Sequence, residues 1–157
     1  MASIRKQIHD NAVALISLFI AVTGLAYNTW RNETSEEQRN IRHAAFTVLE
    51  DLGSMQEVAD ANYYFLAQGK EVGNESELHL RGWGSVLMAR DLMSLMPEPA
   101  PVTGEMLRQT WIDHFSALDD VNAQGRRTAR AGEAKEAIDI AIKESRETVL
   151  MVIKSLE

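Results

Sequence analysis

The feature that most constrains this chain is an uncharged stretch of 19 residues near its N-terminus. Residues 12–30 read AVALISLFIAVTGLAYNTW and contain no Lys, Arg, Asp or Glu. A helix rises about 1.5 Å per residue, so this stretch would cover roughly the ~30 Å hydrocarbon core of a bilayer. It predicts a transmembrane anchor over residues 11–30, between a short N-terminal segment at 1–10 and a soluble domain at 31–157.

The residues that flank this stretch set the expected topology. Basic residues stand at both ends: Arg5 and Lys6 before it, and Arg31, Arg39 and Arg42 after it. Their number alone does not favour a cytoplasmic N-terminus. A short basic N-terminus before one apolar segment is nevertheless typical of a secretory signal or anchor, which favours that orientation. Gly24-Leu25-Ala26 would also suit a signal peptidase, so a cleaved signal peptide is the alternative to the favoured uncleaved anchor.

One face of the apolar stretch carries small or polar residues. They recur at spacings of three and four positions: Ala14, Ser17, Ala21, Gly24 and Asn28. Small side chains let a second helix approach closely, and Ser and Asn can hydrogen-bond across such a contact. Residues of these types are also common in any apolar helix, and the two interpretations weigh evenly. The packing interpretation predicts contact with another transmembrane helix, from a second copy of the chain or from a different protein.

The rest of the chain reads as helices. Thr34 to Glu37 has the spacing of a capping box, and a heptad-like seam of apolar residues follows. The seam consists of Ile41, Ala45, Val48, Leu52, Met55, Ala59, Asn62 and Leu66. Helices are expected over about 35–68, 76–96, 103–124 and 133–157. The predicted fold class is all-α, an N-terminal transmembrane helix followed by an antiparallel four-helix bundle. Whether the anchor continues into the first of these helices stays open.

The second predicted helix contains two glycines around a tryptophan, in the sequence RGWG at 81–84. Each glycine inside a helix costs about 1 kcal/mol relative to alanine, so close packing or a kink is expected there. The alternative is a later helix start, at Gly84, with Trp83 as a hydrophobic plug. The buried face of this helix is expected to consist of Leu80, Trp83, Leu87, Leu92 and Leu95.

Composition excludes several classes of partner. The chain carries 16 Lys and Arg against 23 Asp and Glu, for a net charge of −7, and the excess acid follows the apolar stretch. An acidic domain is repelled by phosphate backbones, which argues against nucleic-acid binding. Cysteine is absent, which excludes disulfides, thiolate nucleophiles and thiolate metal sites. The partners that remain are the lipid bilayer and other proteins.

We find no pattern that predicts a metal, a cofactor or catalysis. Di-iron bundles use Glu-x-x-His, and none of His9, His43, His79 and His114 has a glutamate three residues earlier. The methionines at 88, 93, 96 and 106 could bind Cu(I), but they alternate with leucines at helical spacing, which favours a core or an adaptable surface. No phosphate loop, serine elbow or HExxH motif occurs. The chain is therefore expected to be a non-enzyme without cofactors.

Four residues outside the anchor are candidate contacts for a partner or a ligand: Trp83, Trp111, Arg126 and Arg127. Arg126 and Arg127 belong to the one basic cluster of an acidic domain and could receive a carboxylate. The plainer interpretation is a solvated loop that balances nearby carboxylates such as Asp119 and Asp120.

Two segments carry a resemblance to a known group of proteins. Trp30 to Glu33 reads WRNE and Arg39 to Arg42 reads RNIR, followed by VLEDLG at 48–53. In these features the chain resembles uncharacterised proteobacterial single-pass inner-membrane proteins, which have an N-terminal anchor followed by a WRNE...RNIR neck. The resemblance covers roughly residues 10–60. It implies a bacterial inner-membrane protein with a periplasmic helical domain, and it carries no activity.

Two hypotheses for function follow. The first is a non-enzymatic accessory or scaffold protein of the membrane, whose anchor packs against partner helices and whose acidic periplasmic bundle mediates protein–protein contacts. The alternative is a periplasmic, sensor-like bundle that binds a small ligand between its helices. Residues 1–10 are too short for a signalling domain, so such a sensor is expected to act through a partner.

Overall fold

The computed structural model describes residues 11–65 and 75–156. Within these residues the protein is all-α, with four α-helices, one short 3₁₀ segment and no strand. The α-helices are α2 (Ala12–Tyr64), α3 (Glu75–Met93), α4 (Ala100–His114) and α5 (Ala129–Ser155), and the 3₁₀ segment η2 is Phe115–Ala117. The chain divides after Asn40 into two compact units.

The capping box expected at Thr34 is not formed, because this residue lies inside α2. Its hydroxyl donates to the carbonyl oxygen of Trp30 at 3.0 Å, four residues earlier in the same helix. A capping threonine would instead accept from a backbone N–H further along the chain. The weak helix formers at 28–35 do not end the helix. The helix expected to begin near residue 35 is therefore part of α2.

The second unit is built on the predicted seam of α2. Ala45, Val48, Leu52, Met55 and Ala59 are buried in one hydrophobic core together with residues of α3, α4 and α5. Ile41 packs against the edge of that core, and Asn62 is buried with its amide donating to the carbonyl oxygen of Val58 at 2.8 Å. The period of the seam is thus confirmed, and its last member, Leu66, lies outside the described residues.

The predicted buried face of α3 is only partly right. Trp83 and Leu92 are partly buried against the core, but Leu80 is 75% exposed and Leu95, just after the helix, is 72% exposed. Val86, Ala89 and Met93 are buried instead. The reason is Gly82, whose Cα faces the core. A Cβ placed there would lie 2.7 Å from Trp111 Cζ2 and 3.0 Å from Val58 Cγ1. The helix therefore approaches its neighbours through a glycine and medium-sized side chains, and several of its leucines face outward.

The ends of the other helices differ from the expected limits for local reasons. α3 ends at Met93 rather than near 96, ahead of Pro97 and Pro99, which disfavour helix in the residues before them. α4 begins at Ala100, before the expected start near 103, so Thr103 lies in its first turn and donates to the carbonyl oxygen of Pro99.

The last two helices are separated by a longer non-helical stretch than expected. α4 ends at His114 and passes into η2 and turns, although helix was expected to 124. α5 begins at Ala129, before the expected start near 133, because Thr128 caps it by accepting from the backbone N–H of Ala131 at 3.3 Å. Gly132 lies inside α5 and does not break it.

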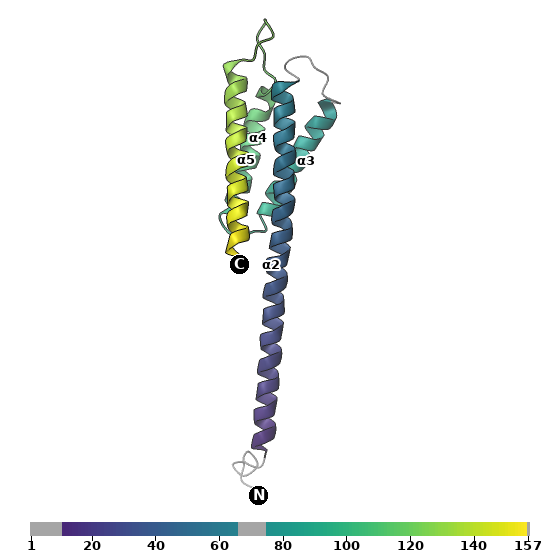
Figure 1. Cartoon of the computed structure of the whole chain (residues 1–157), viewed down its shortest axis with the longest axis vertical. Coiled ribbons are helices and arrows are strands. Elements are labelled where there is room, and N and C mark those ends of the chain that lie inside the picture. Colours follow the sequence, from purple (N-terminus) through teal and green to yellow (C-terminus); the bar gives the residue numbers. More distant parts are fainter. Residues whose placement is uncertain (1–10, 66–74, 157) are drawn as a thin grey trace. The chain divides into compact units, whose positions relative to one another are not determined.

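Within the second unit, α3, α4 and α5 lie alongside the part of α2 that follows residue 40 (Figure 1). Two arginines connect α2 to the chain at either end of α5. Arg42 Nη2 donates to the carbonyl oxygen of Leu156 at 2.7 Å, and Arg127 Nε donates to the carbonyl oxygen of Tyr63 at 2.5 Å. Each cation thus satisfies a free carbonyl at a helix C-terminus, where positive charge is favoured.

Candidate functional site

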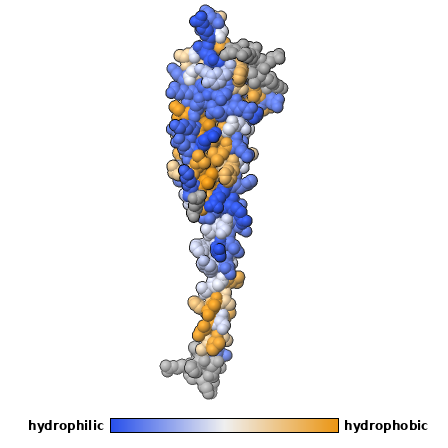
Figure 2. Space-filling model, in the orientation of Figure 1, coloured by the Kyte–Doolittle hydropathy of each residue, from blue (hydrophilic) through white to orange (hydrophobic). Residues whose placement is uncertain are grey.

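The apolar part of α2 presents its side chains to the surroundings rather than to the chain itself. Residues 13–33 are all exposed within the chain. Figure 2 shows hydrophobic side chains gathered along this part of the helix. The helix is long and apolar enough to cross a membrane. α2 is therefore a candidate membrane-spanning helix near the N-terminus.

The five residues of the predicted packing face are all exposed on this helix: Ala14, Ser17, Ala21, Gly24 and Asn28. Around Gly24 nothing lies within 4 Å of an added Cβ, so the position is open to another helix. At the end of the stretch the rings of Tyr27 and Trp30 lie 6.2 Å apart, and these two residue types are enriched where helices leave a membrane. Contact of this face with another helix stays a prediction.

The four candidate contact residues do not come together. Trp111 is 1% exposed and fills the core, with its ring stacked on Phe115 at a centroid distance of 4.5 Å. Trp83 is half-buried at the edge of the core, and Arg126 is exposed in the turn before α5. The guanidinium of Arg127 lies 4.3 Å over the ring of Tyr63 and holds the end of α2. Trp111 is thus a core residue, and Arg127 serves the fold.

A buried lysine between two helices was not expected from the sequence. Lys135 of α5 is 6% exposed, and its Nζ donates to both carboxylate oxygens of Asp139 at 2.5 and 2.6 Å. The same Nζ lies 2.9 Å from Asp60 Oδ1 of α2. Gln56 Nε2 donates to both carboxylates, at 3.1 Å to Asp60 and 2.9 Å to Asp139.

The protonation of Lys135 follows from these contacts. Burial alone lowers the pKa of Lys135, but the hydrogen bonds and charges of Asp139 and Asp60 together outweigh it, so the pKa is raised. The lysine is therefore a cation that both helices share. An open hollow of about 330 Å³ lies beside Lys135 and Asp139 and is lined partly by Tyr63, Tyr64 and Lys143. Solvent can reach the ion pair of Lys135 and Asp139 through it.

Asp51 of α2 is the second titratable group that the fold perturbs. Burial raises the pKa of Asp51, Ser85 partly offsets this with a hydrogen bond, and the charge of Glu50 adds to the rise. Its Oδ2 is buried and has no hydrogen-bond partner.

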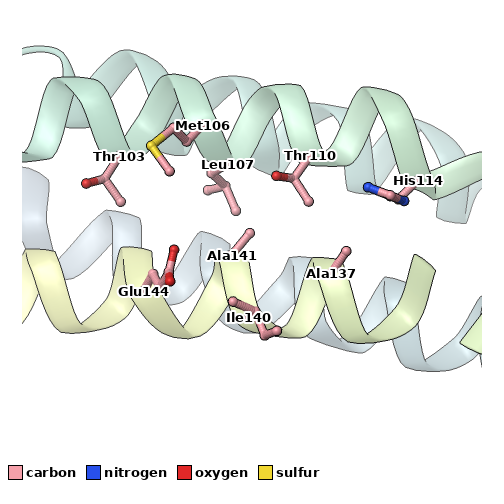
Figure 3. Close-up of a pocket in the computed structure, with 9 residues that line it drawn as sticks. All are labelled: Thr103, Met106, Leu107, Thr110, His114, Ala137, Ile140, Ala141 and Glu144. Atoms are coloured by element: carbon pink, nitrogen blue, oxygen red, sulfur yellow. The ribbon is translucent and has the colours of Figure 1, made fainter. Parts of the chain in front are cut away.

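A cleft lies between α4 and α5 in the second unit. It has a volume of about 240 Å³ and is lined from α4 by Thr103, Met106, Leu107, Thr110 and His114, and from α5 by Ala137, Ile140, Ala141 and Glu144. Figure 3 shows the two rows facing each other, with Glu144 near Thr103 at one end and Ala137 near His114 at the other. Apolar side chains occupy the middle.

The sequence did not indicate this cleft. Of the histidines and methionines that the sequence offers as metal ligands, His114 and Met106 line it, and neither tryptophan nor either candidate arginine does. The signal was present in the alanines of α5, because Ala137 and Ala141 leave space where larger residues would fill the groove between neighbouring helices. No group of three or more His, Asp or Glu that could hold a metal occurs among residues 11–65 and 75–156.

No family model, no curated protein and no solved structure matches the chain.

Proposed function

We propose that this chain is a non-enzymatic single-pass membrane accessory or scaffold protein. Its anchor would pack against a partner transmembrane helix, and its acidic bundle would contact other proteins. The observation that carries the proposal is the exposed, uncharged face of α2 over residues 13–30, which is favourable only in lipid or against another apolar helix.

The proposal includes an antiparallel arrangement of the four helices in the second unit. Positions early in one helix contact positions late in its neighbour, as the side-chain pairs between α2 and α5 and between α3 and α4 illustrate: Arg42 with Leu156, Asp60 with Lys135, Arg90 with Glu105, and His79 with Phe115. Such crossed pairs support antiparallel neighbours.

Paired cysteines can test the arrangement, because the natural chain has no cysteine. The hydroxyls of Thr103 on α4 and Thr148 on α5 lie 3.4 Å apart. The variant Thr103→Cys with Thr148→Cys should form an intramolecular disulfide on mild oxidation. The pair Thr110→Cys with Thr148→Cys, two turns further along α4, is the control and should not. A disulfide in the control alone would contradict the alignment that places Thr103 opposite Thr148.

The proposed location is the bacterial inner membrane, with the N-terminus in the cytoplasm and the bundle in the periplasm. The support is the basic N-terminal segment before a single apolar stretch, together with the resemblance of the neck. A single cysteine at the exposed Ser116 should react with a membrane-impermeant maleimide added to intact spheroplasts. Labelling only after lysis would show that the bundle faces the cytoplasm and would contradict this orientation.

The packing face of the anchor gives the test of the accessory role. Ala21→Leu with Gly24→Leu would fill the space through which a second helix approaches, so recovery of a crosslinked partner should fall several-fold. Val22→Leu, which lies off the stripe, is the matched control and should leave recovery unchanged. Mild extraction that yields only an uncrosslinked monomer from the wild type would contradict the proposal.

The α4–α5 cleft favours a second candidate function, the binding of a small ligand by a sensor-like bundle that acts through a partner. A concave site with an apolar middle and a few convergent polar groups is the usual form of a ligand site. A thermal-unfolding screen of the full chain in detergent should identify small molecules that raise the melting temperature. The gain should disappear in Ala141→Leu, which fills the cleft.

A further inference from the structure

We propose that the α4–α5 cleft binds a small organic cation, an elongated molecule with an ammonium group at one end and an apolar body. This inference rests on the second candidate function, ligand binding, and adds the chemical class of the ligand. It is carried by the distribution of charge and apolar surface along the cleft, one end of which holds an unpaired carboxylate.

The size of the cleft limits the ligand. Its volume of about 240 Å³ is below the roughly 300–1,000 Å³ of sites for drug-sized molecules, so the ligand is small. Seven positions separate Ala137 from Glu144 on α5, which at about 1.5 Å per residue gives a length of roughly 10 Å. Between these ends Leu107, Ile140 and Ala141 form an apolar wall. This wall suits a phenyl ring or a short alkyl chain.

The end at Glu144 selects for positive charge. Figure 3 shows this carboxylate directed into the gap between the two helices. In the part of the chain that the structure describes, Glu144 has no ion-pair partner. The Nζ of the adjacent Lys143 lies 4.0 Å from Oε1 of Glu147 instead. An ammonium group in the cleft would supply the missing cation and donate a charge-assisted hydrogen bond.

Thr103 adds a second acceptor at the same end. Its hydroxyl donates to the carbonyl oxygen of Pro99 at 3.0 Å, and the hydroxyl of Thr148 lies 3.4 Å from it. A hydroxyl oxygen has two lone pairs, so one stays free to accept from a ligand. A carboxylate and an accepting hydroxyl together suit a group with several N–H donors. A ligand carboxylate here would face the like charge of Glu144.

The opposite end is polar and adaptable. The side chains of Thr110 and His114 both point into the cleft, and neither makes a hydrogen bond to another described residue. Each can donate or accept. This end therefore tolerates an apolar terminus or a neutral polar group, and it places no second charge requirement on the ligand.

Three probes that share a phenylpropyl skeleton and differ in their terminal group test the selection for charge: 3-phenylpropan-1-amine, 3-phenylpropan-1-ol and 3-phenylpropanoate. The full chain, in nanodiscs of zwitterionic lipid, would carry ¹³C-labelled alanine and methionine methyls. The amine should shift the methyl signals of Ala137, Ala141 and Met106 in a saturable way. Its affinity should exceed that of the alcohol by about fivefold, as for a solvent-accessible ion pair, and the acid should bind more weakly than both.

Two variants on exposed positions of α5 complete the test. Glu144→Gln keeps the shape of the side chain but removes its charge, so the affinity for the amine should fall to that for the alcohol. Glu133→Gln, also exposed on α5 but outside the cleft, is the control and should leave all three affinities unchanged. Equal binding of amine and acid, or no effect of Glu144→Gln, would overturn the proposal that the ligand is a cation, while ligand binding itself would stand. The absence of any shift with any probe up to its solubility limit would also overturn the cation proposal. The thermal-unfolding screen would then test ligand binding separately.

Discussion

Two glycines of α3 that lie two positions apart should respond in opposite ways to the same substitution. An added Cβ at Gly82 would lie 2.7 Å from Trp111 Cζ2 and 3.0 Å from Val58 Cγ1, whereas at Gly84 nothing lies within 4 Å. Both positions are helical, so both variants gain the same backbone preference of about 1 kcal/mol for alanine over glycine. Any difference between Gly82→Ala and Gly84→Ala therefore measures packing alone.

The contact at Gly82 leaves little room for adjustment. The indole of Trp111 is 1% exposed and is stacked on Phe115, so it cannot move away without disturbing a second ring. Overpacking of a core costs typically about 1–3 kcal/mol. We expect Gly84→Ala to stabilise the chain by about 0.5–1 kcal/mol. Gly82→Ala should be less stable than Gly84→Ala by about 1–3 kcal/mol.

Urea unfolding of the full chain in detergent, followed by circular dichroism, gives the two free energies directly. Thermal unfolding offers a second readout, since 1 kcal/mol corresponds to roughly 3–5 °C for a unit of this size. The wild type is the common reference. If Gly82→Ala proves as stable as Gly84→Ala, the close approach of α3 to the core is refuted.

Three further substitutions test other contacts. Lys135→Met should cost about 1–3 kcal/mol, less than a fully buried pair because its carboxylate partners keep contact with water. In the wild type the stabilisation from the charged Lys135 is present below about pH 10.4 and is lost as the pH rises through its raised pKa. Urea unfolding at pH 8 and at pH 11 should therefore show a smaller loss of stability in the variant at pH 11. Asp51→Asn should gain stability relative to the wild type as the pH rises from about 3.9 towards 7, because the raised pKa of Asp51 makes its ionisation destabilising; a pH-independent difference would contradict this. Arg127→Lys keeps the charge but loses the planar contact with Tyr63 and should cost about 1 kcal/mol in the same assay, while no loss would show that charge alone suffices.

The sequence was sufficient for the all-α class and for the seam of α2, because a period of 3.5 over many residues is a strong signal. Ala45, Val48 and Leu52 are buried as expected. The prediction for α3 failed at Leu80 and Leu95, because a pattern search ranks leucine above glycine as a core residue. At Gly82 the absence of a side chain, not the presence of one, brings the helix to its neighbours.

The contacts that cross between helices could not be read from local patterns. Lys135 and Asp60 are 75 positions apart, and nothing near either residue indicates that they pair. The α4–α5 cleft was missed for the same reason, since Thr103 and Glu144 become neighbours only when two helices are aligned. Caps were missed where helices began earlier than expected, as at Thr128.

The lysine that α2 and α5 share has a consequence for how the two helices align along their length. If α5 slid by one turn, either Ala131 or Asp139 would occupy the place of Lys135 opposite Asp60. The first shift would leave a carboxylate without its cation, and the second would set two carboxylates against each other. Apolar residues at Ile138 and Ile142 would tolerate such a slide far better. The ion pair therefore selects one register of the helices, a role that buried polar groups can have even when they add little net stability.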